Sequence, residues 1–351
     1  MTSTPRNTPA SFSARSVLLI RLGAIGDVVN TLVLANALKR AAPGCRLGWA
    51  VGPRALPLLE RHPAVDTTHL VDVSRPASIP AAIAGLRAGG YELALDLQRL
   101  FKSGLLAWLS GAPERLGYDF NRARELSWLF TNRKLPPHDP QRHVVDQLLE
   151  FARFLGVPQP AVEWRLQPSA AARERAAGIL LPGQTWVALH LGAGKPANRW
   201  PSTGWARLAT GLVRTGGLSV CLVGGPGEVM TARAVEGLVP AGFMPLDLVG
   251  KTSLDDLMAV LERASVVVSA DSGPMHLAVA LGRPVVALFG PANPLRTGPY
   301  GQPDNVVGRS DLWCAPCFRK RPCDHYECMP GLHAERVLAR VLEQVRVGGS
   351  C

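Results

Sequence analysis

Residues 270–291 read A-D-S-G-P-M-H-L-A-V-A-L-G-R-P-V-V-A-L-F-G-P, and this stretch decides the fold class. An apolar run at 265–269 leads into it, and a second run at 284–289 follows its central segment. A buried strand, a turn, a short helix and a second buried strand form the repeating unit of a parallel sheet. The stretch therefore predicts an α/β protein.

The turn within this stretch carries residue types that begin and end helices. Asp271 and Ser272 are favoured N-cap residues, and Pro274 suits the first helical position. Gly273 allows close approach of a ligand, and Gly282 stands where a helix end favours a left-handed residue. The free N–H groups and positive dipole end of such a helix attract anions. We therefore expect a site for a phosphorylated small molecule.

The same alternation of strand and helix runs along the whole chain. The expected strands are 17–21, 47–51, 69–73, 93–97, 186–190, 219–223, 245–249, 266–269 and 285–289. The expected helices are 28–40, 53–61, 79–88, 143–155 and 334–347. Such a series predicts parallel, doubly wound sheets with ligands bound at the carboxyl ends of the strands.

The length of 351 residues favours two α/β domains over one. We expect a disordered tail at 1–15, a Rossmann-like domain at 16–160 and a Pro- and Ala-rich linker at 161–184, which contains a charged helical patch. A second Rossmann-like domain is expected at 185–333, followed by a helix and tail at 334–351. Two such domains facing each other would bind ligands in a central cleft.

The composition bounds the classes of partner. The net charge of +11 reflects either an arginine-biased composition or attraction to anionic partners such as nucleotides, phosphorylated lipids or a membrane surface. The basic residues are scattered, without a zinc finger, an RNP-like strand or a basic tail, so we expect no nucleic-acid partner. No apolar run approaches the roughly 20 residues that span a bilayer, and we expect a cytoplasmic protein.

The first expected strand ends in the turn R-L-G-A-I-G-D-V-V-N at 21–30. Gly23 and Gly26 let the backbone turn tightly near a ligand. Asp27 is either a helix cap or a catalytic carboxylate, and spacing alone favours the cap. The turn is not the G-x-G-x-x-G fingerprint, so a dinucleotide dehydrogenase gains little support.

A second loop, H-L-G-A-G-K-P-A-N-R-W-P at 190–201, follows the first strand of the second half. Gly192 and Ala193 are small, and two cations follow them. Lys195 and Arg199 are suited to a diphosphate, the lysine as a point charge and the arginine through paired N–H groups. Solvated surface residues are the alternative for both.

The chain resembles glycosyltransferase family 9, the ADP-heptose:lipopolysaccharide heptosyltransferases, over residues 17–347. The motifs are R-L-G-A-I-G-D-V-V, D-L-Q-R-L-F-K-S-G-L-L-A-W-L-S-G-A, the H-L-G-A-G loop ending in R-W-P, and the stretch at 271–291. The resemblance implies a GT-B fold and transfer of a heptose, with inversion, from an ADP-heptose donor to the inner core of lipopolysaccharide.

The resemblance also assigns roles to residues. It implies that Asp27 is the general base, and that a donor-binding loop consists of Asp271, Ser272, Gly273, Pro274, Met275 and His276. Gly192, Ala193, Lys195 and Arg199 would lie on the donor side as well. The family often has a lysine where this chain has Asn198, so either Lys195 or Arg199 supplies that charge or the donor differs.

On the acceptor side the resemblance implies Gly23, Gly26, Gln98, Arg99 and Lys102, with a cation near acceptor phosphates. A solvated helix start is the alternative for each of the last three residues. The chain contains no D-x-D sequence, so we expect no catalytic metal and no cofactor beyond the donor substrate.

Four cysteines form a cluster with the spacing of a small metal site or thiol group: Cys314, Cys317, Cys323 and Cys328. A structural zinc, reduced thiols and a redox-dependent staple are the alternatives. None of them makes the cluster catalytic.

The leading hypothesis is an inverting heptosyltransferase that acts on a lipid A-linked acceptor at the cytoplasmic face of the inner membrane, by peripheral contact. The alternatives are a transferase with another nucleotide-sugar donor or acceptor, and a non-catalytic nucleotide-sugar-binding protein.

Overall fold

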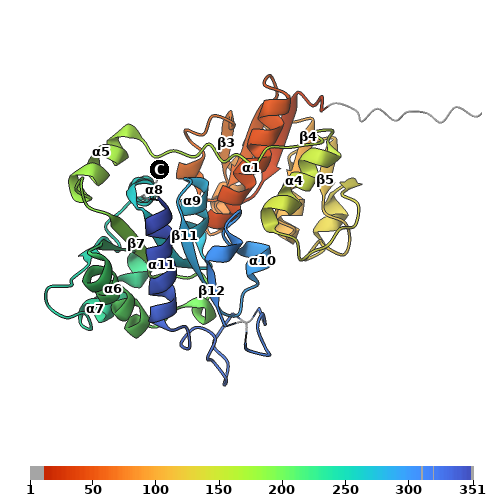
Figure 1. Cartoon of the computed structure of the whole chain (residues 1–351). Helices are drawn as coiled ribbons and strands as arrows, with labels where there is room; N and C mark the ends of the chain where they lie inside the picture. Colours follow the sequence, from red (N-terminus) through yellow and green to blue (C-terminus); the bar gives the residue numbers. More distant parts are fainter. Residues whose placement is uncertain (1–11, 310, 319, 349–351) are drawn as a thin grey trace, which may run out of the picture. The chain divides into compact units, whose positions relative to one another are not determined.

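The computed structural model describes residues 12–309, 311–318 and 320–348. The chain forms two compact units that divide between Arg165 and Leu166. The expected disordered tail therefore lies largely outside the described residues. Each unit is built around its own parallel sheet, visible in Figure 1.

The sheet of the first unit has six strands in the order β3-β2-β1-β4-β5-β6, and every neighbouring pair is parallel. The strands are β1 Ser16–Ile20, β2 Arg46–Val51, β3 Thr67–Leu70, β4 Leu93–Asp96, β5 Glu114–Gly117 and β6 Arg133–Lys134. All five residues of β1 are buried, as expected for a central strand covered on both faces. The order reverses between β1 and β4, which is where doubly wound sheets bind ligands.

The helices of the first unit are α1 Ile25–Ala41, α2 Ile79–Ala88, α3 Phe101–Leu109 and α4 Val144–Phe154, with the 3-10 turns η1 Leu56–Leu58, η2 Pro76–Ser78 and η3 Ser127–Phe130. The helix expected at 53–61 is wrong, because only the single turn η1 forms there. Pro57 has no N–H to donate within a helix, and the segment closes as a series of tight turns.

The sheet of the second unit has the order β12-β11-β10-β7-β8-β9 and is again entirely parallel. Its strands are β7 Trp186–His190, β8 Ser219–Val223, β9 Leu246–Asp247, β10 Val266–Ala270, β11 Val285–Phe289 and β12 Val306–Gly308. Counted from β7, this is the same strand order as in the first unit. The reversal lies between β7 and β10.

The helices of the second unit are α5 Ala170–Ile179, α6 Ser202–Gly216, α7 Val229–Glu236, α8 Leu254–Arg263, α9 Gly273–Ala280, α10 Pro294–Thr297 and α11 Ala334–Gly348, with the turns η4 Pro196–Asn198, η5 Pro226–Glu228 and η6 Pro303–Asn305. The segment at 161–184 contains α5, which packs against α8 (Figure 1). Ser169 caps α5, and its hydroxyl donates to Asp255 at 2.6 Å. The final helix α11 packs on α6 and the sheet.

Four short strands were missed or misjudged in the sequence, and the helices α3, α6, α7 and α8 were not among the expected ones. β5 and β6 are polar, β12 has three residues, and β9 covers only two residues of the strand expected at 245–249. Pairing with a neighbouring strand forms these elements, since their own apolar content is small. Among the described residues, no helix is long and apolar enough to cross a membrane.

Candidate active site

The candidate site of the first unit lies at the carboxyl ends of β1 and β4, where the strand order of this unit reverses. Ile20 at the end of β1 pairs in register with Asp96 at the end of β4. The residues that follow both strands therefore share one edge of the sheet. Such an edge is where open α/β sheets bind their ligands.

Arg21 follows β1 and fixes the direction of Asp27. The Nη1 group of Arg21 donates to the carbonyl oxygen of Leu97, and its Nη2 group lies 2.5 Å from Oδ1 of Asp27. The other carboxylate oxygen, Oδ2, accepts a hydrogen bond from the backbone N of Ala24 at 3.1 Å. Asp27 thus makes the capping contact that spacing favours, yet 41% of its side chain stays exposed. An oriented, accessible carboxylate is compatible with both interpretations of Asp27.

The turn after β4 is organised by Asp96, which is 2% exposed. Its Oδ1 accepts hydrogen bonds from the backbone N atoms of Gln98 at 3.1 Å and Arg99 at 3.2 Å. Burial raises the pKa of the Asp96 carboxyl above its usual range. The side-chain oxygen of Gln98 accepts a 2.8 Å hydrogen bond from the N of Leu22. Gln98 therefore joins the two turns that the sequence assigns to the acceptor side.

The other acceptor-side residues surround this junction. Arg99 has a φ of 66°, and its guanidinium lies 4.8 Å from the centroid of the buried Tyr118 ring. Lys102 is exposed in the first turn of α3, and Gly26 is buried in the first turn of α1. A Cβ at Gly23 would meet no atom within 4 Å, which leaves open space beside the turn.

The candidate site of the second unit lies at the ends of β7 and β10. His190 ends β7 in register with Ser269 of β10. The Nδ1 atom of His190 is 3.1 Å from the hydroxyl of Ser269 and 3.2 Å from that of Ser272, and the two hydroxyls are 2.9 Å apart. Burial lowers the pKa of His190 to about 4, so the imidazole is neutral at pH 7.

Helix α9 begins directly after this hydroxyl cluster. Ser272 occupies the N-cap position, but its side chain makes no capping hydrogen bond because the hydroxyl contacts His190 and Ser269. The side-chain capping expected there is therefore wrong for Ser272. Because its hydroxyl does not bind them, the first N–H groups of α9 can bind other partners. Gly282 has a φ of 72°, which confirms the expected left-handed residue after the helix.

The remaining residues of the expected donor loop differ in exposure. Gly273 and Pro274 are half-buried at the start of α9, whereas Met275 is fully buried and His276 is 8% exposed. Asp271 accepts a hydrogen bond at 3.3 Å from the side-chain amide of Asn198, which is 2% exposed. This contact ties the donor loop to the loop after β7.

The loop after β7 combines tight packing with free cations. A Cβ at Gly192 would lie 2.9 Å from Cδ of Glu228 and 3.1 Å from Cε1 of His190, so only glycine fits there without a shift. Ala193 is 8% exposed. Lys195 is half-buried and Arg199 is exposed, and neither has an ion-pair partner among the described residues. Both cations remain available to an anion.

The segment that holds the four cysteines supports these loops from outside. The Tyr326 hydroxyl lies 3.2 Å from the carbonyl oxygen of Ala197 and 3.0 Å from that of Arg199. The N of Phe318 donates to the carbonyl oxygen of Pro291 at 2.7 Å, and Cys328 packs beside Gly290. Burial of Tyr326 near cysteine thiols raises its pKa to about 12, so the hydroxyl stays protonated and can donate.

In the described part of this segment, the four cysteines do not gather into a metal site. Cys314, Cys317, Cys323 and Cys328 are free thiols. Across the part of the chain that the structure describes, no three His, Cys, Asp or Glu residues gather closely enough to hold a metal ion. The structural zinc considered from spacing therefore gains no support here. The Cys-x-x-Cys spacing of Cys314 and Cys317 does not by itself bring Cys323 and Cys328 close to them.

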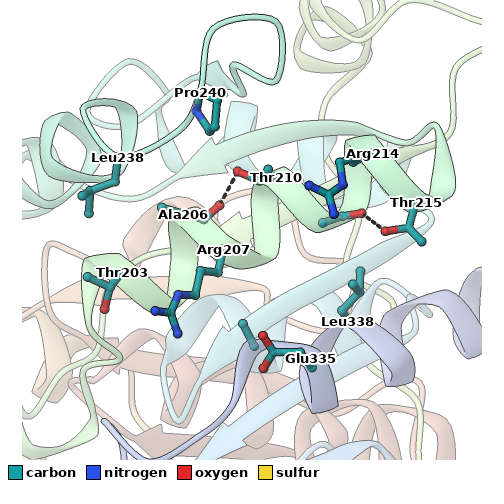
Figure 2. A pocket seen from close by; sticks show the side chains of 12 residues that line it. Thr203, Ala206, Arg207, Thr210, Arg214, Thr215, Leu238, Pro240, Glu335 and Leu338 are labelled. Atoms are coloured by element: carbon teal, nitrogen blue, oxygen red, sulfur yellow. Dashed lines mark hydrogen bonds between the residues drawn. The ribbon is translucent and has the colours of Figure 1, made fainter.

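Two large hollows lie away from the candidate site. One, of about 620 Å³, is bounded by α6, the α7–β9 connection and the start of α11 (Figure 2). Its Thr210 and Thr215 hydroxyls donate to carbonyl oxygens of their own helix. The other, also about 620 Å³, borders Glu92 and Leu93 at the amino end of β4 in the first unit. Neither hollow borders the carboxyl ends of β1, β4, β7 or β10.

Three contributors were missed in the sequence. Arg21 directly follows β1, and Glu228 ends a glycine turn that follows β8. Glu228 accepts a hydrogen bond from the N of Gly225 at 2.9 Å and lies against Gly192. Tyr326 had no sequence signal, because only folding brings it to the donor-side loop.

Comparison with known proteins identifies the family. Residues 80–326 match the sequence profile of "Glycosyltransferase family 9 (heptosyltransferase)". The chain is 32% identical to lipopolysaccharide heptosyltransferase 1 of Pseudomonas aeruginosa over 324 residues, covering 87% of this chain and 86% of the relative. It is 28% identical to the lipopolysaccharide core heptosyltransferase OpsX of Haemophilus influenzae over 296 residues, 84% of each chain.

Solved structures agree. The chain is similar to the E. coli heptosyltransferase WaaC with ADP, with a TM-score of 0.74 and 28% identity over 94% of this chain and 99% of that one. A family 9 glycosyltransferase from Veillonella parvula has a TM-score of 0.81 at 21% identity over 97% and 99% of the two chains. The expected GT-B fold class, with two Rossmann-like doubly wound units, is thereby confirmed. The chain belongs to glycosyltransferase family 9, the heptosyltransferase family, and is a glycosyltransferase.

Proposed function

We propose that this protein transfers a heptose from ADP-heptose to the inner core of lipopolysaccharide, with inversion at the anomeric carbon. Relatives named lipopolysaccharide or lipooligosaccharide heptosyltransferase support this substrate class. A related structure contains ADP and another contains ADP-2-deoxy-2-fluoro heptose. The single observation that carries the mechanism is the oriented, exposed carboxylate of Asp27.

Asp27 acts as the general base in this proposal. Sugar transfer requires the acceptor hydroxyl to lose a proton as the glycosidic bond breaks through an oxocarbenium-like state. The contacts with Arg21 and Ala24 hold the carboxylate in one direction, which favours proton transfer from a positioned hydroxyl. Attack on the face opposite the leaving ADP inverts the anomeric centre.

The leaving diphosphate is stabilised by protein groups. The N–H groups at the start of α9 and the cations of Lys195 and Arg199 are suited to the charge that develops on ADP. Glu228 follows the second strand of its unit, a position from which carboxylates of Rossmann-like folds bind ribose hydroxyls. We propose that these groups act without a catalytic metal or other cofactor.

The acceptor is proposed to be lipid A-linked and bound beside Gly23, Gly26, Gln98, Arg99 and Lys102. The two cations would meet acceptor phosphates. Such an acceptor lies in the cytoplasmic leaflet of the inner membrane, so the protein works there by peripheral contact. Nucleic acid is no part of this function.

A release assay tests the proposal. Purified protein with ADP-heptose and a deacylated core acceptor is expected to release ADP and give a product one heptose heavier by mass spectrometry. Tight donor binding without ADP release on any core acceptor would favour a non-catalytic binding protein. Parallel reactions with GDP-, UDP- and CMP-sugars test which nucleotide the donor carries. A donor with another nucleotide is the main alternative, because the neutral amide of Asn198, and not a lysine, contacts Asp271.

A further inference from the structure

Exposed apolar side chains gather on one part of the first unit. Phe101 is 46% exposed, Phe120 65%, Leu126 56% and Leu129 57%. These four residues, here called the apolar shelf, come from the start of α3, the β5–η3 connection and η3. Large apolar side chains exposed on adjoining elements mark interaction sites when they form one patch.

The apolar shelf has a rigid backing. The rings of Phe101 and Phe130 lie 5.1 Å apart edge to face, and those of Phe120 and Trp128 lie 5.2 Å apart. A Cβ at Gly104 would lie 2.8 Å from the carbonyl oxygen of Ser127, so α3 and η3 are in close contact. These contacts hold the Phe101 and Phe120 rings at the surface, which lowers the entropy cost of a docking event.

Cations border the apolar shelf. Lys102 and Arg124 are exposed and have no ion-pair partner in the described part of the chain. The nearby Glu125 carboxylate accepts a hydrogen bond from the N of Phe101 at 3.4 Å, and its single negative charge is outnumbered by these two cations. The N of Arg124 donates to the carbonyl oxygen of Arg99 at 3.0 Å, which links the shelf to the expected acceptor-side turn.

We propose that the apolar shelf is the surface by which this protein docks on an anionic phospholipid bilayer. Aromatic and aliphatic side chains enter the headgroup region while Arg124 meets lipid phosphates. A second copy of the chain fits less well, because a symmetric interface would bring two basic rims together. The inference rests on the proposed function, since docking here brings the acceptor-side turn to a lipid-linked acceptor.

Vesicle binding tests the proposal directly. Full-length protein is mixed with vesicles of phosphatidylglycerol and phosphatidylethanolamine, or of phosphatidylcholine alone, and bound protein is measured by co-sedimentation. We expect binding to the anionic vesicles that weakens with salt. The triple variant Phe120→Ser/Leu126→Ser/Leu129→Ser is expected to bind at least about tenfold more weakly, because three buried apolar contacts are lost.

A matched control removes equally exposed side chains from the second unit. Leu238, Met244 and Leu295 are 51%, 52% and 75% exposed, and their triple serine variant is expected to bind vesicles like the wild type. If circular dichroism shows that the triple variant does not fold, the single variants Phe120→Ser and Arg124→Gln replace it. Each is expected to weaken vesicle binding by a few fold. Unchanged vesicle binding by the folded shelf variants would overturn the proposal, as would a shelf variant that only converts a dimer to a monomer.

Turnover separates this inference from the proposed function. With a soluble, deacylated acceptor the shelf variant is expected to match the wild type, whereas with lipid-linked acceptor in vesicles its rate is expected to fall with its binding. Absence of turnover on either acceptor by the wild type would contradict the heptosyltransferase proposal and leave the vesicle measurement to decide docking alone. Equal loss on both acceptors would contradict docking.

Discussion

The Nη2 group of Arg21 lies 2.5 Å from Oδ1 of Asp27, an ion pair between the residue after β1 and the first turn of α1. The arginine side chain is 9% exposed and also donates to the carbonyl oxygen of Leu97, so it is held from the neighbouring strand. The direction of the Asp27 carboxylate is therefore set by tertiary contacts as well as by its own helix.

Replacing Asp27 by Asn is expected to reduce turnover by at least about a hundredfold, because the amide cannot accept the acceptor proton. ADP binding, measured by calorimetry, should stay near the wild-type value. Asp146 is a matched control, since it occupies the same third position in the first turn of α4 as Asp27 does in α1. Turnover by Asp27→Asn as fast as by Asp146→Asn would exclude Asp27 as the base.

Alanine substitutions at two glycines of the loop after β7, Gly192 and Gly194, are expected to affect the donor KM differently. In Gly192→Ala the new Cβ would lie 2.9 Å from Glu228 and 3.1 Å from His190, so both side chains must shift. We expect the donor KM to rise by roughly tenfold, in line with overpacking costs of about 1–3 kcal/mol. Gly194→Ala is the control, because no atom lies within 4 Å of its Cβ position. Equal KM values for the two variants would contradict a donor role for this loop.

Neutralising Lys195 or Arg199 is expected to weaken ADP binding by about tenfold or more, since each charge-assisted hydrogen bond contributes about 1.5–3 kcal/mol. The affinity of the wild type should fall as salt rises, and less steeply in Lys195→Gln and Arg199→Gln. Arg207→Gln provides the control, because Arg207 borders the hollow beside α6. Calorimetry at two salt concentrations gives the comparison, and equal slopes in all variants would argue against a diphosphate contact.

Tyr326→Phe removes only the hydroxyl that contacts the carbonyl oxygens of Ala197 and Arg199. Losing a hydrogen bond of about 1 kcal/mol should raise the donor KM by about fivefold, with little change in kcat. A thermal unfolding scan distinguishes this effect from global destabilisation. A lowered Tm with an unaltered KM would mean that Tyr326 stabilises the unit without positioning the donor loop.

Burial of His190 makes stability depend on pH. Its pKa is lowered to about 4 from 6.5, so between these values the unfolded chain binds a proton that the folded unit does not. The free energy of unfolding therefore rises with pH across this window. His190 contributes up to about 3 kcal/mol to this rise, and the contribution is lost as the pH falls through the window.

Urea unfolding at pH 4.5 and pH 7 measures this effect. His190→Gln should show a smaller difference between the two pH values than the wild type. His62→Gln is the comparison in the first unit, because burial lowers the pKa of His62 as well. An identical pH difference in His190→Gln and the wild type would show that His190 titrates normally in the folded state.

The fold was largely predictable where local sequence and tertiary environment agree. Strands such as 186–190 are apolar because parallel strands are buried on both faces, and α2 lies where its pattern predicts. β5 and β6 were missed because neighbouring strands, not their own composition, hold them in the sheet. The helix expected at 53–61 failed because Pro57 interrupts its hydrogen bonding.

The sequence by itself determined the fold class, the family resemblance and the turns that carry Asp27 and Asp271, because strand, turn and helix signals are local. Only the tertiary structure decided the partners of those residues. Arg21 reaches Leu97 across 76 positions, Asn198 reaches Asp271 across 73, and Tyr326 reaches Arg199 across 127. Contacts between residues so distant in the chain depend on strand order and loop packing, which set the geometry of the site after the local elements have formed.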